Sequence, residues 1–149
     1  MKSSQPSRGE RSSRRIEPSS PIVFVVDDDI SVRESLELLI QKQAWQPKTF
    51  SSAQEFLESP RVLVPNCLLL DISLPGLNGL DLQKRIAIEP AEMPIIFITG
   101  YGDVAKSVEA MKGGAAEFLT KPLNHEVLLS AIRQSLERSR VAGELLFRP

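Results

Sequence analysis

Short, fully apolar runs recur along the chain from residue 21 onward, and segments with apolar residues at helical spacing separate them. The runs consist mainly of β-branched, aliphatic and aromatic residues, which is typical of strands buried on both faces of a parallel sheet. The second run is weaker, because Pro47 confines it to a sheet edge or to the first residues of a strand. The predicted strands are 22–26, 45–50, 66–72, 93–99 and 115–120.

One helix is predicted after each strand. The fourth helix is expected to stop at Gly113 and Gly114, since glycine readily ends a helix. Short connections between alternating strands and helices imply a parallel sheet covered on both faces, so we predict an α/β fold with a doubly wound, five-stranded parallel sheet. The predicted helices are 31–43, capped by Ser31 with Glu34 completing a capping box; 51–59, capped by Ser51 or Ser52; 79–88; 102–114, capped by Asp103; and 124–140.

The two ends of the chain differ in composition from the rest. Residues 1–20 are rich in Ser, Arg and Pro, with five basic residues against two acidic ones, whereas the whole chain has a net charge of −1. Such a segment buries too little apolar surface to offset the entropy of ordering, so we predict a disordered basic tail. It is either a solvated leader or an anchor for an acidic partner or nucleic acid. Residues 21–140 form the predicted domain, and residues 141–149 a C-terminal tail or truncated linker.

Composition excludes several classes of function. The net charge argues against a surface that coats nucleic acid. Cys67 is the single cysteine and cannot form an internal disulfide, so we expect it in the core, and Trp45 is expected to pack under the second strand. His125, the single histidine, cannot supply a histidine-based triad or zinc site and is expected on the surface. No apolar stretch approaches the roughly 20 residues that cross a membrane, and no secretory signal follows the basic N-terminus. We predict a cytoplasmic protein.

Polar residues stand at the ends of four predicted strands. The first strand runs into three aspartates, the third ends at Asp71, the fourth at Thr99, and Lys121 follows the fifth. In open α/β sheets, functional residues gather beyond the carboxyl ends of the strands. Carboxylate oxygens suit Mg²⁺, and an aspartate can accept a phosphoryl group as an acyl phosphate. The sequence therefore predicts a magnesium-assisted phosphoacceptor site, in which Asp29 alone is better explained as a helix cap.

These motifs resemble the receiver domain of two-component response regulators, over Ile22 to about Arg140. The resemblance is carried by VVDDD, LLLDISLPGLNGLDL, IIFITGYGD and GGAAEFLTKPL. The spacings of 43, 28 and 22 residues between Asp28, Asp71, Thr99 and Lys121 suit that family. The resemblance implies the flavodoxin-like fold of receivers. It is most pronounced toward receivers that precede a helix-turn-helix DNA-binding domain of the LuxR type.

The resemblance also implies roles for individual residues. Asp28, Asp71 and the backbone carbonyl of Ser73 would bind Mg²⁺ directly, and Asp27 would act through water. Asp71 would accept the phosphoryl group from a phosphohistidine on a sensor histidine kinase. Lys121 would hold one phosphoryl oxygen and Thr99 another, and the bond between Lys121 and Pro122 would be cis. The chain would be a signalling domain rather than an enzyme, with intrinsic phosphotransfer and autodephosphorylation only.

A conformational switch follows from the same resemblance. Thr99 and Phe118 would couple the site to a face formed by the fourth helix, the fifth strand and the last helix; Phe118 lacks the hydroxyl of the tyrosine found there in many receivers. That face would mediate phosphorylation-dependent homodimerisation or contact with an output partner, with transcription regulation as the outcome. DNA would be reached only through an output domain absent from this chain. The residues expected on this face are Val104, Val108, Met111 and Leu123.

Other interpretations remain open. A stand-alone receiver could act through protein contacts, and a pseudo-receiver could signal without phosphate, although Asp71 and Lys121 are both present. A nucleotide-binding or phosphatase domain of flavodoxin-like architecture would need a phosphate-cradling loop after the first strand, and DDDIS is the electrostatic opposite of one. A HAD-type phosphatase would place its nucleophile after the first strand in a D-x-D arrangement, with further motifs that the sequence lacks.

Overall fold

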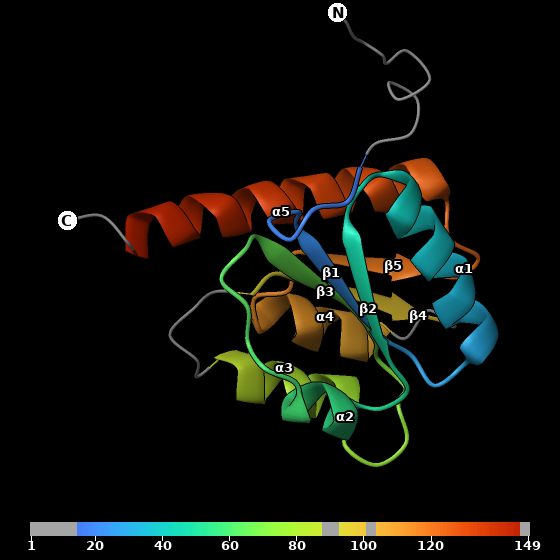
Figure 1. Cartoon of the computed structure of the whole chain (residues 1–149). Coiled ribbons are helices and arrows are strands. Elements are labelled where there is room, and N and C mark those ends of the chain that lie inside the picture. Colours follow the sequence, from blue (N-terminus) through green and yellow to red (C-terminus); the bar gives the residue numbers. More distant parts are fainter. Residues whose placement is uncertain (1–14, 88–92, 101–103, 147–149) are drawn as a thin grey trace, which may run out of the picture.

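The computed structural model describes residues 15–87, 93–100 and 104–146, which form the α/β fold predicted from the sequence (Figure 1). Five parallel strands are arranged in the order β2-β1-β3-β4-β5. The strands are β1 (Ile22–Val26), β2 (Gln46–Phe50), β3 (Asn66–Asp71), β4 (Ile95–Thr99) and β5 (Glu117–Thr120). The helices are α1 (Ile30–Lys42), α2 (Ala53–Glu58), α3 (Gly79–Ala87), α4 (Val104–Lys112) and α5 (His125–Leu146).

Helices cover both faces of the sheet, as the prediction required. Alternate residues of β3 point to opposite faces, so that Leu68 and Leu70 join one apolar cluster while Cys67 and Leu69 join the other. The first cluster is covered by α2, α3 and α4 and the second by α1 and α5 (Figure 1). Burial on both faces explains why the central strands have no alternating polar residues.

Individual predictions about the strands and core are also confirmed. The weak strand β2 lies at the edge of the sheet, where Pro47 is tolerated. Trp45 is buried beside this strand in the second cluster. Cys67 is fully buried, and burial raises the pKa of its thiol, so it behaves as a core residue. His125 is exposed at the start of α5.

Two residues were predicted to cap the first helix: Ser31, with Glu34 in a capping box, is wrong, and Asp29 is confirmed. Asp29 is the N-cap, and its Oδ1 accepts a hydrogen bond from the Ser31 backbone N–H at 2.9 Å. The helix therefore begins at Ile30, earlier than expected, because the last of the three aspartates already offers a carboxylate to the first turn. At α2 the predicted alternative Ser52 is the cap, with its Oγ accepting from the Glu55 N–H at 3.1 Å.

The end of α4 is confirmed where Gly113 and Gly114 were expected to stop it. Gly114 has a positive φ of 99°. Its N–H donates to the Met111 carbonyl, and the Ala115 N–H donates to the Ala110 carbonyl, at 3.1 Å in each case. These two bonds form a Schellman motif, which glycine supports because it lacks a Cβ. The predicted cap at the other end of this helix, Asp103, lies outside the described residues.

The last helix is longer than predicted. We expected it to end at residue 140, whereas α5 spans 22 residues and ends at Leu146. Arg140 forms ion pairs with Glu137 and Glu144, at spacings that stabilise a helix. The assignment of residues 141–149 to a C-terminal tail or linker stays a prediction. Despite the length of α5, no helix in the described ranges is apolar enough over a sufficient length to cross a membrane.

Candidate functional site

The carboxyl edge of the sheet brings together polar residues that are far apart in the sequence. Asp27 directly follows β1, Asp71 ends β3, Thr99 ends β4, and Lys121 directly follows β5. Carboxylate oxygens of Asp27, Asp28 and Asp71 all lie within 4.8 Å of one another. Asp27, Asp71 and Thr99 are buried, while Asp28 is exposed, so the acidic cluster opens to solvent on one side.

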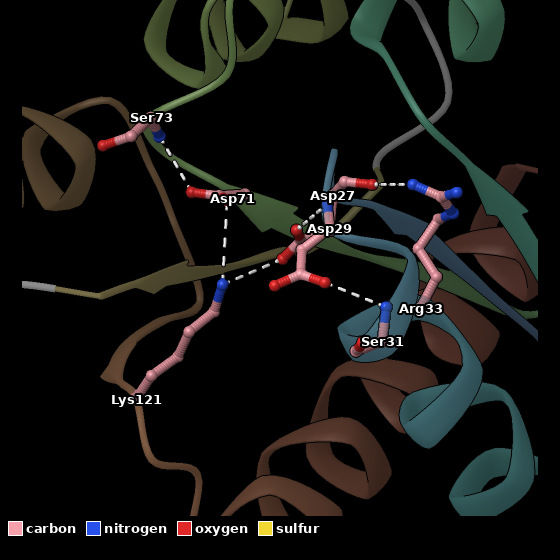
Figure 2. A network of polar contacts seen from close by, with 7 residues as sticks. All are labelled: Asp27, Asp29, Ser31, Arg33, Asp71, Ser73 and Lys121. Atoms are coloured by element: carbon pink, nitrogen blue, oxygen red, sulfur yellow. Dashed lines mark hydrogen bonds and ion pairs between the residues drawn. The ribbon is translucent and has the colours of Figure 1, made fainter.

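Lys121 connects the two buried aspartates. Figure 2 shows its ammonium group between their carboxylates, with Nζ 3.1 Å from Asp27 Oδ2 and 3.8 Å from Asp71 Oδ2. The Lys121 backbone N–H donates to the Thr99 carbonyl at 2.7 Å, which fixes the residue where β5 ends. The bond between Lys121 and Pro122 is cis, as the sequence resemblance implies. One ammonium cannot neutralise three carboxylates, so the cluster retains negative charge.

Backbone donors orient both buried carboxylates. The Asp27 Oδ1 accepts from the Asp29 N–H, and the Asp71 Oδ1 accepts from the Ser73 N–H, each at 2.9 Å (Figure 2). The remaining oxygen of each carboxylate then faces Lys121. Arg33 on α1 donates through Nη1 to the Asp27 carbonyl at 2.6 Å, a contact that the sequence does not indicate, because it depends on how α1 packs beside β1.

The charges shift the titration of both key groups. Burial raises the pKa of Asp71, the negative charges of Asp27 and Asp28 raise it further, and the Ser73 N–H and Lys121 oppose them. Burial alone lowers the pKa of Lys121, but the hydrogen bond and charge of Asp27, with the charge of Asp71, raise it overall. These shifts favour the protonated form of Lys121 and disfavour the ionised form of Asp71.

We expect Asp71→Asn to stabilise the metal-free fold by about 1–3 kcal/mol at neutral pH, the usual cost of a poorly compensated buried polar group. A folded-state pKa raised above the unfolded value contributes stability below the unfolded pKa and loses it as pH rises through the folded pKa. The advantage of the neutral amide should therefore shrink as pH falls toward about 4, near the ordinary aspartate pKa. Urea unfolding of the variant and the wild type in EDTA, at neutral pH and at about pH 4, measures this difference in the free energy of unfolding.

Asp81→Asn is the matched control, because Asp81 is exposed on α3. Its effect should stay within about 0.5 kcal/mol at either pH. A wild type as stable as Asp71→Asn at neutral pH would show that the cluster imposes no penalty. Added Mg²⁺ should stabilise the wild type more than Asp71→Asn, since binding to the folded state raises stability.

The donor set fits a hard divalent cation. Three carboxylates within 4.8 Å offer only oxygen ligands, and the exposed Asp28 leaves room for bound water. The residues available to hold such an ion are Asp28 and Asp71, with Asp27 tied to Lys121. The assignment of the Ser73 carbonyl as a ligand stays a prediction; Ser73 lies beside Asp71, with its N–H toward that carboxylate (Figure 2).

The two predicted switch residues lie on neighbouring strands. Phe118 in β5 is paired in register with Phe97 in β4, with ring centroids 6.2 Å apart, and packs against the first apolar cluster. Thr99 is 3% exposed, two residues after Phe97 on the same strand. Their neighbourhood suits coupling between the site and β5, and their roles in switching stay predictions.

The expected output face is largely at the surface. Val104 is 77% exposed, and Val108 and Met111 are each 46% exposed, so α4 presents apolar side chains to solvent. Leu123 is less exposed than expected, because it is partly buried against the second apolar cluster. Leu123 lines a pocket together with Val32 and Leu36 of α1, which accounts for that burial.

Fold and site together define a class of protein: a doubly wound parallel α/β domain whose carboxyl edge holds an acidic cluster and a lysine. Residues 23–133 match the response regulator receiver domain family, and the chain belongs to that family. It is thus a receiver domain of two-component response regulators, a class of signalling domains. The resemblance inferred from the sequence is confirmed.

The similar proteins include regulators of transcription. The chain is 50% identical over 123 residues to nodulation protein W of Bradyrhizobium diazoefficiens, covering 83% of this chain and 54% of that protein. It is 42% identical over 126 residues to transcriptional regulatory protein FixJ of Azorhizobium caulinodans, covering 85% and 60%. The chain thus spans between half and two thirds of the length of these curated relatives.

Solved structures agree with the fold. The response regulator StyR superposes with a TM-score of 0.75 at 45% identity, covering 80% of this chain and 61% of that chain. Full-length FixJ from B. japonicum gives a TM-score of 0.74 at 36% identity, covering 83% and 61%. A CheY-like receiver domain protein from Methanospirillum hungatei gives 0.73 at 28% identity, covering 83% and 98%. The predicted receiver fold is confirmed.

Proposed function

We propose that this domain is phosphorylated on Asp71 by the phosphohistidine of a sensor histidine kinase and thereby switches its partner contacts. The observation that carries the proposal is the position of Asp71: it ends β3 within the acidic cluster, with Oδ2 3.8 Å from the Lys121 ammonium. A carboxylate so placed can attack phosphorus while a cation stands beside the oxygens that gain charge.

Each residue of the site has a distinct part in the transfer. An Asp71 carboxylate oxygen attacks the phosphorus, the bond from phosphorus to the donor nitrogen breaks, and the donor imidazole keeps the electron pair. Lys121, kept protonated by its acidic neighbours, holds a phosphoryl oxygen. The Thr99 hydroxyl, at the end of the neighbouring strand, holds another.

Asp28, Asp71 and the Ser73 backbone carbonyl would hold Mg²⁺, with Asp27 acting through water. When bound, Mg²⁺ neutralises charge on the phosphoryl oxygens. In the unphosphorylated chain Lys121 is nearer to Asp27 than to Asp71, at 3.1 Å against 3.8 Å. The phosphoryl group on Asp71 would therefore compete with Asp27 for this ammonium, which links phosphorylation to a local rearrangement.

The output is a shift between two conformations of the face formed by α4, β5 and α5, coupled through Thr99 and Phe118. That face would carry phosphorylation-dependent homodimerisation or an output partner. The similarity to the transcriptional regulatory protein FixJ supports transcription regulation as the outcome. Contact with DNA would come from an output domain outside this chain. The domain would act in the cytoplasm. Its chemistry would be limited to its own phosphorylation and dephosphorylation.

Intact-protein mass spectrometry tests the proposal. After incubation with acetyl phosphate and Mg²⁺, the chain should gain one phosphoryl mass. Because the cluster keeps excess negative charge without a cation, EDTA should abolish the gain and excess Mg²⁺ should restore it. Uptake that is unchanged by EDTA would contradict the role of the acidic cluster. No uptake from acetyl phosphate or from a phosphorylated kinase would instead favour a phosphate-independent pseudo-receiver.

A further inference from the structure

A buried glutamine joins α3 to the end of α4. Gln83 is 5% exposed and shares the buried face of α3 with Leu82 and Ile86, and its Nε2 donates to the Ala110 carbonyl at 2.8 Å. Ala110 belongs to the last turn of α4 and already accepts the Ala115 N–H of the Schellman motif. Gln83 thus supplies a second donor to a carbonyl at the negative end of the α4 dipole.

Gly113 makes room for this contact. A Cβ at position 113 would lie 2.7–2.9 Å from the three amide atoms of Gln83, closer than such contacts allow. The amide therefore fills the space that a side chain at residue 113 would occupy. The helix stop was expected to need glycine, but the positive φ belongs to Gly114, so the close approach of Gln83 is a separate reason for glycine at 113.

Most side chains of α4 are exposed to solvent. Ala110 is the one buried residue of this nine-residue helix, while Val104, Val108 and Met111 are exposed. A second link to α3, between Lys84 and Glu109 at 3.8 Å, joins two exposed side chains and adds little in water. The Gln83 bond is therefore a buried polar link between α3 and the last turn of α4, beside the packing of Ala110 in the core.

The other end of α3 is fixed to the phosphoacceptor strand. A Cβ on Gly79 would lie 2.9 Å from the Asp71 carbonyl oxygen and 2.9 Å from the Ile72 Cα, so α3 approaches this backbone closely. The Phe97 ring, which contacts Phe118, lies 3.1 Å from the same position. Helix α3 is thus packed closely against the phosphoacceptor strand at Gly79 and bonded to α4 through Gln83.

We propose that Gln83 is a positioning residue that tethers α4 in its unphosphorylated placement and so sets how easily the switch occurs. The bond forms only while the last turn of α4 lies against α3, so any displacement of that turn breaks it. Removing the bond should favour displaced conformers. The regulatory part of this proposal rests on the proposed phosphorylation of Asp71; the tether itself does not.

Gln83→Met tests the tether, because methionine keeps the volume and removes the donor. Hydrogen exchange of the unphosphorylated chain should show the amides of the last turn of α4 opening about fivefold more, the scale of one lost hydrogen bond. Arg85→Met, on the same helix but exposed, should leave them unchanged. Gly113→Ala should reproduce the Gln83→Met effect, since its Cβ displaces the amide.

Beryllofluoride with Mg²⁺, a tetrahedral phosphoryl mimic, tests the regulation by calorimetric titration. If the tether opposes switching, Gln83→Met should bind the mimic about fivefold more tightly, because coupling between two sites is reciprocal. Faster exchange with unchanged affinity would show a purely structural tether and overturn the regulatory inference. Unchanged exchange would overturn the tether itself. A wild type that binds no beryllofluoride would refute the proposed function, and the exchange data would then decide the tether alone.

Discussion

Asp71→Asn should abolish phosphoryl uptake from acetyl phosphate, with no mass gain under conditions that fully phosphorylate the wild type. The amide lacks the negative oxygen that attacks phosphorus. It also removes one of the three carboxylates whose oxygens lie within 4.8 Å, so the cation site is weakened at the same time. The variant is expected to fold at least as stably as the wild type, since Asp71 is an unfavourably placed anion, so loss of uptake cannot be attributed to unfolding.

Asp29→Asn is the matched control. Asp29 lies two residues from Asp27 but caps α1 instead of joining the cluster, and asparagine is as good a cap. This variant should be phosphorylated at a rate close to that of the wild type. Any phosphate found on the Asp71→Asn chain would place the acceptor at another residue. Peptide mapping of the modified wild type gives the same answer independently.

Lys121→Met should slow phosphoryl uptake by about 100-fold or more, the usual consequence of removing one donor that stabilises developing charge. The variant also leaves Asp27, whose side chain is 2% exposed, without its ion-pair partner at 3.1 Å. Stability should fall by about 1–3 kcal/mol, since the lost partner leaves a buried group poorly compensated. Rates are therefore measured by mass spectrometry at a temperature where circular dichroism shows a fully folded chain.

Two comparisons separate chemistry from folding for Lys121. Lys48→Met makes the same charge change at an exposed position on the edge strand β2, and its uptake should match that of the wild type. Mg²⁺ should still stabilise Lys121→Met against urea, because Asp28 and Asp71 remain. Uptake within threefold of the wild-type rate would mean that Lys121 serves only to compensate the buried carboxylates.

Local sequence patterns were sufficient for most of the fold. Uninterrupted apolar runs identified the central strands, and Pro47 identified the edge strand. The sequence offered both Ser31 and Asp29 as caps of α1, and only the path of the chain after β1 decides in favour of Asp29. The end of α5 was misjudged because the ion pairs of Arg140 with Glu137 and Glu144 extend a helix beyond its buried part.

The candidate site was predictable for a different reason. Parallel strands place their carboxyl ends together, so the residues after each strand had to meet whatever the details of packing. Contacts that depend on helix placement could not be anticipated. The Arg33 bond to the Asp27 carbonyl depends on how α1 is oriented against β1. The Gln83 bond to the Ala110 carbonyl depends on how α3 and α4 are aligned along their axes. Gln83 stands four residues after Gly79 and three before Ile86, on the buried face of α3, so its burial follows the helical pattern, but that pattern does not identify the carbonyl that its amide contacts.

The ion pair between Asp27 and Lys121 also bears on how the domain is made. Its partners are 94 residues apart, and their strands β1 and β5 are separated in the sheet by β3 and β4. The ribosome synthesises Asp27, Asp28 and Asp71 before Lys121. A growing chain therefore contains the three carboxylates without the ammonium group that forms ion pairs with Asp27 and Asp71. Long-range closure of this kind comes late in folding. If Asp71 is phosphorylated as proposed, a nascent receiver domain would not accept the phosphoryl group before its last strand is in place, because Lys121 follows that strand.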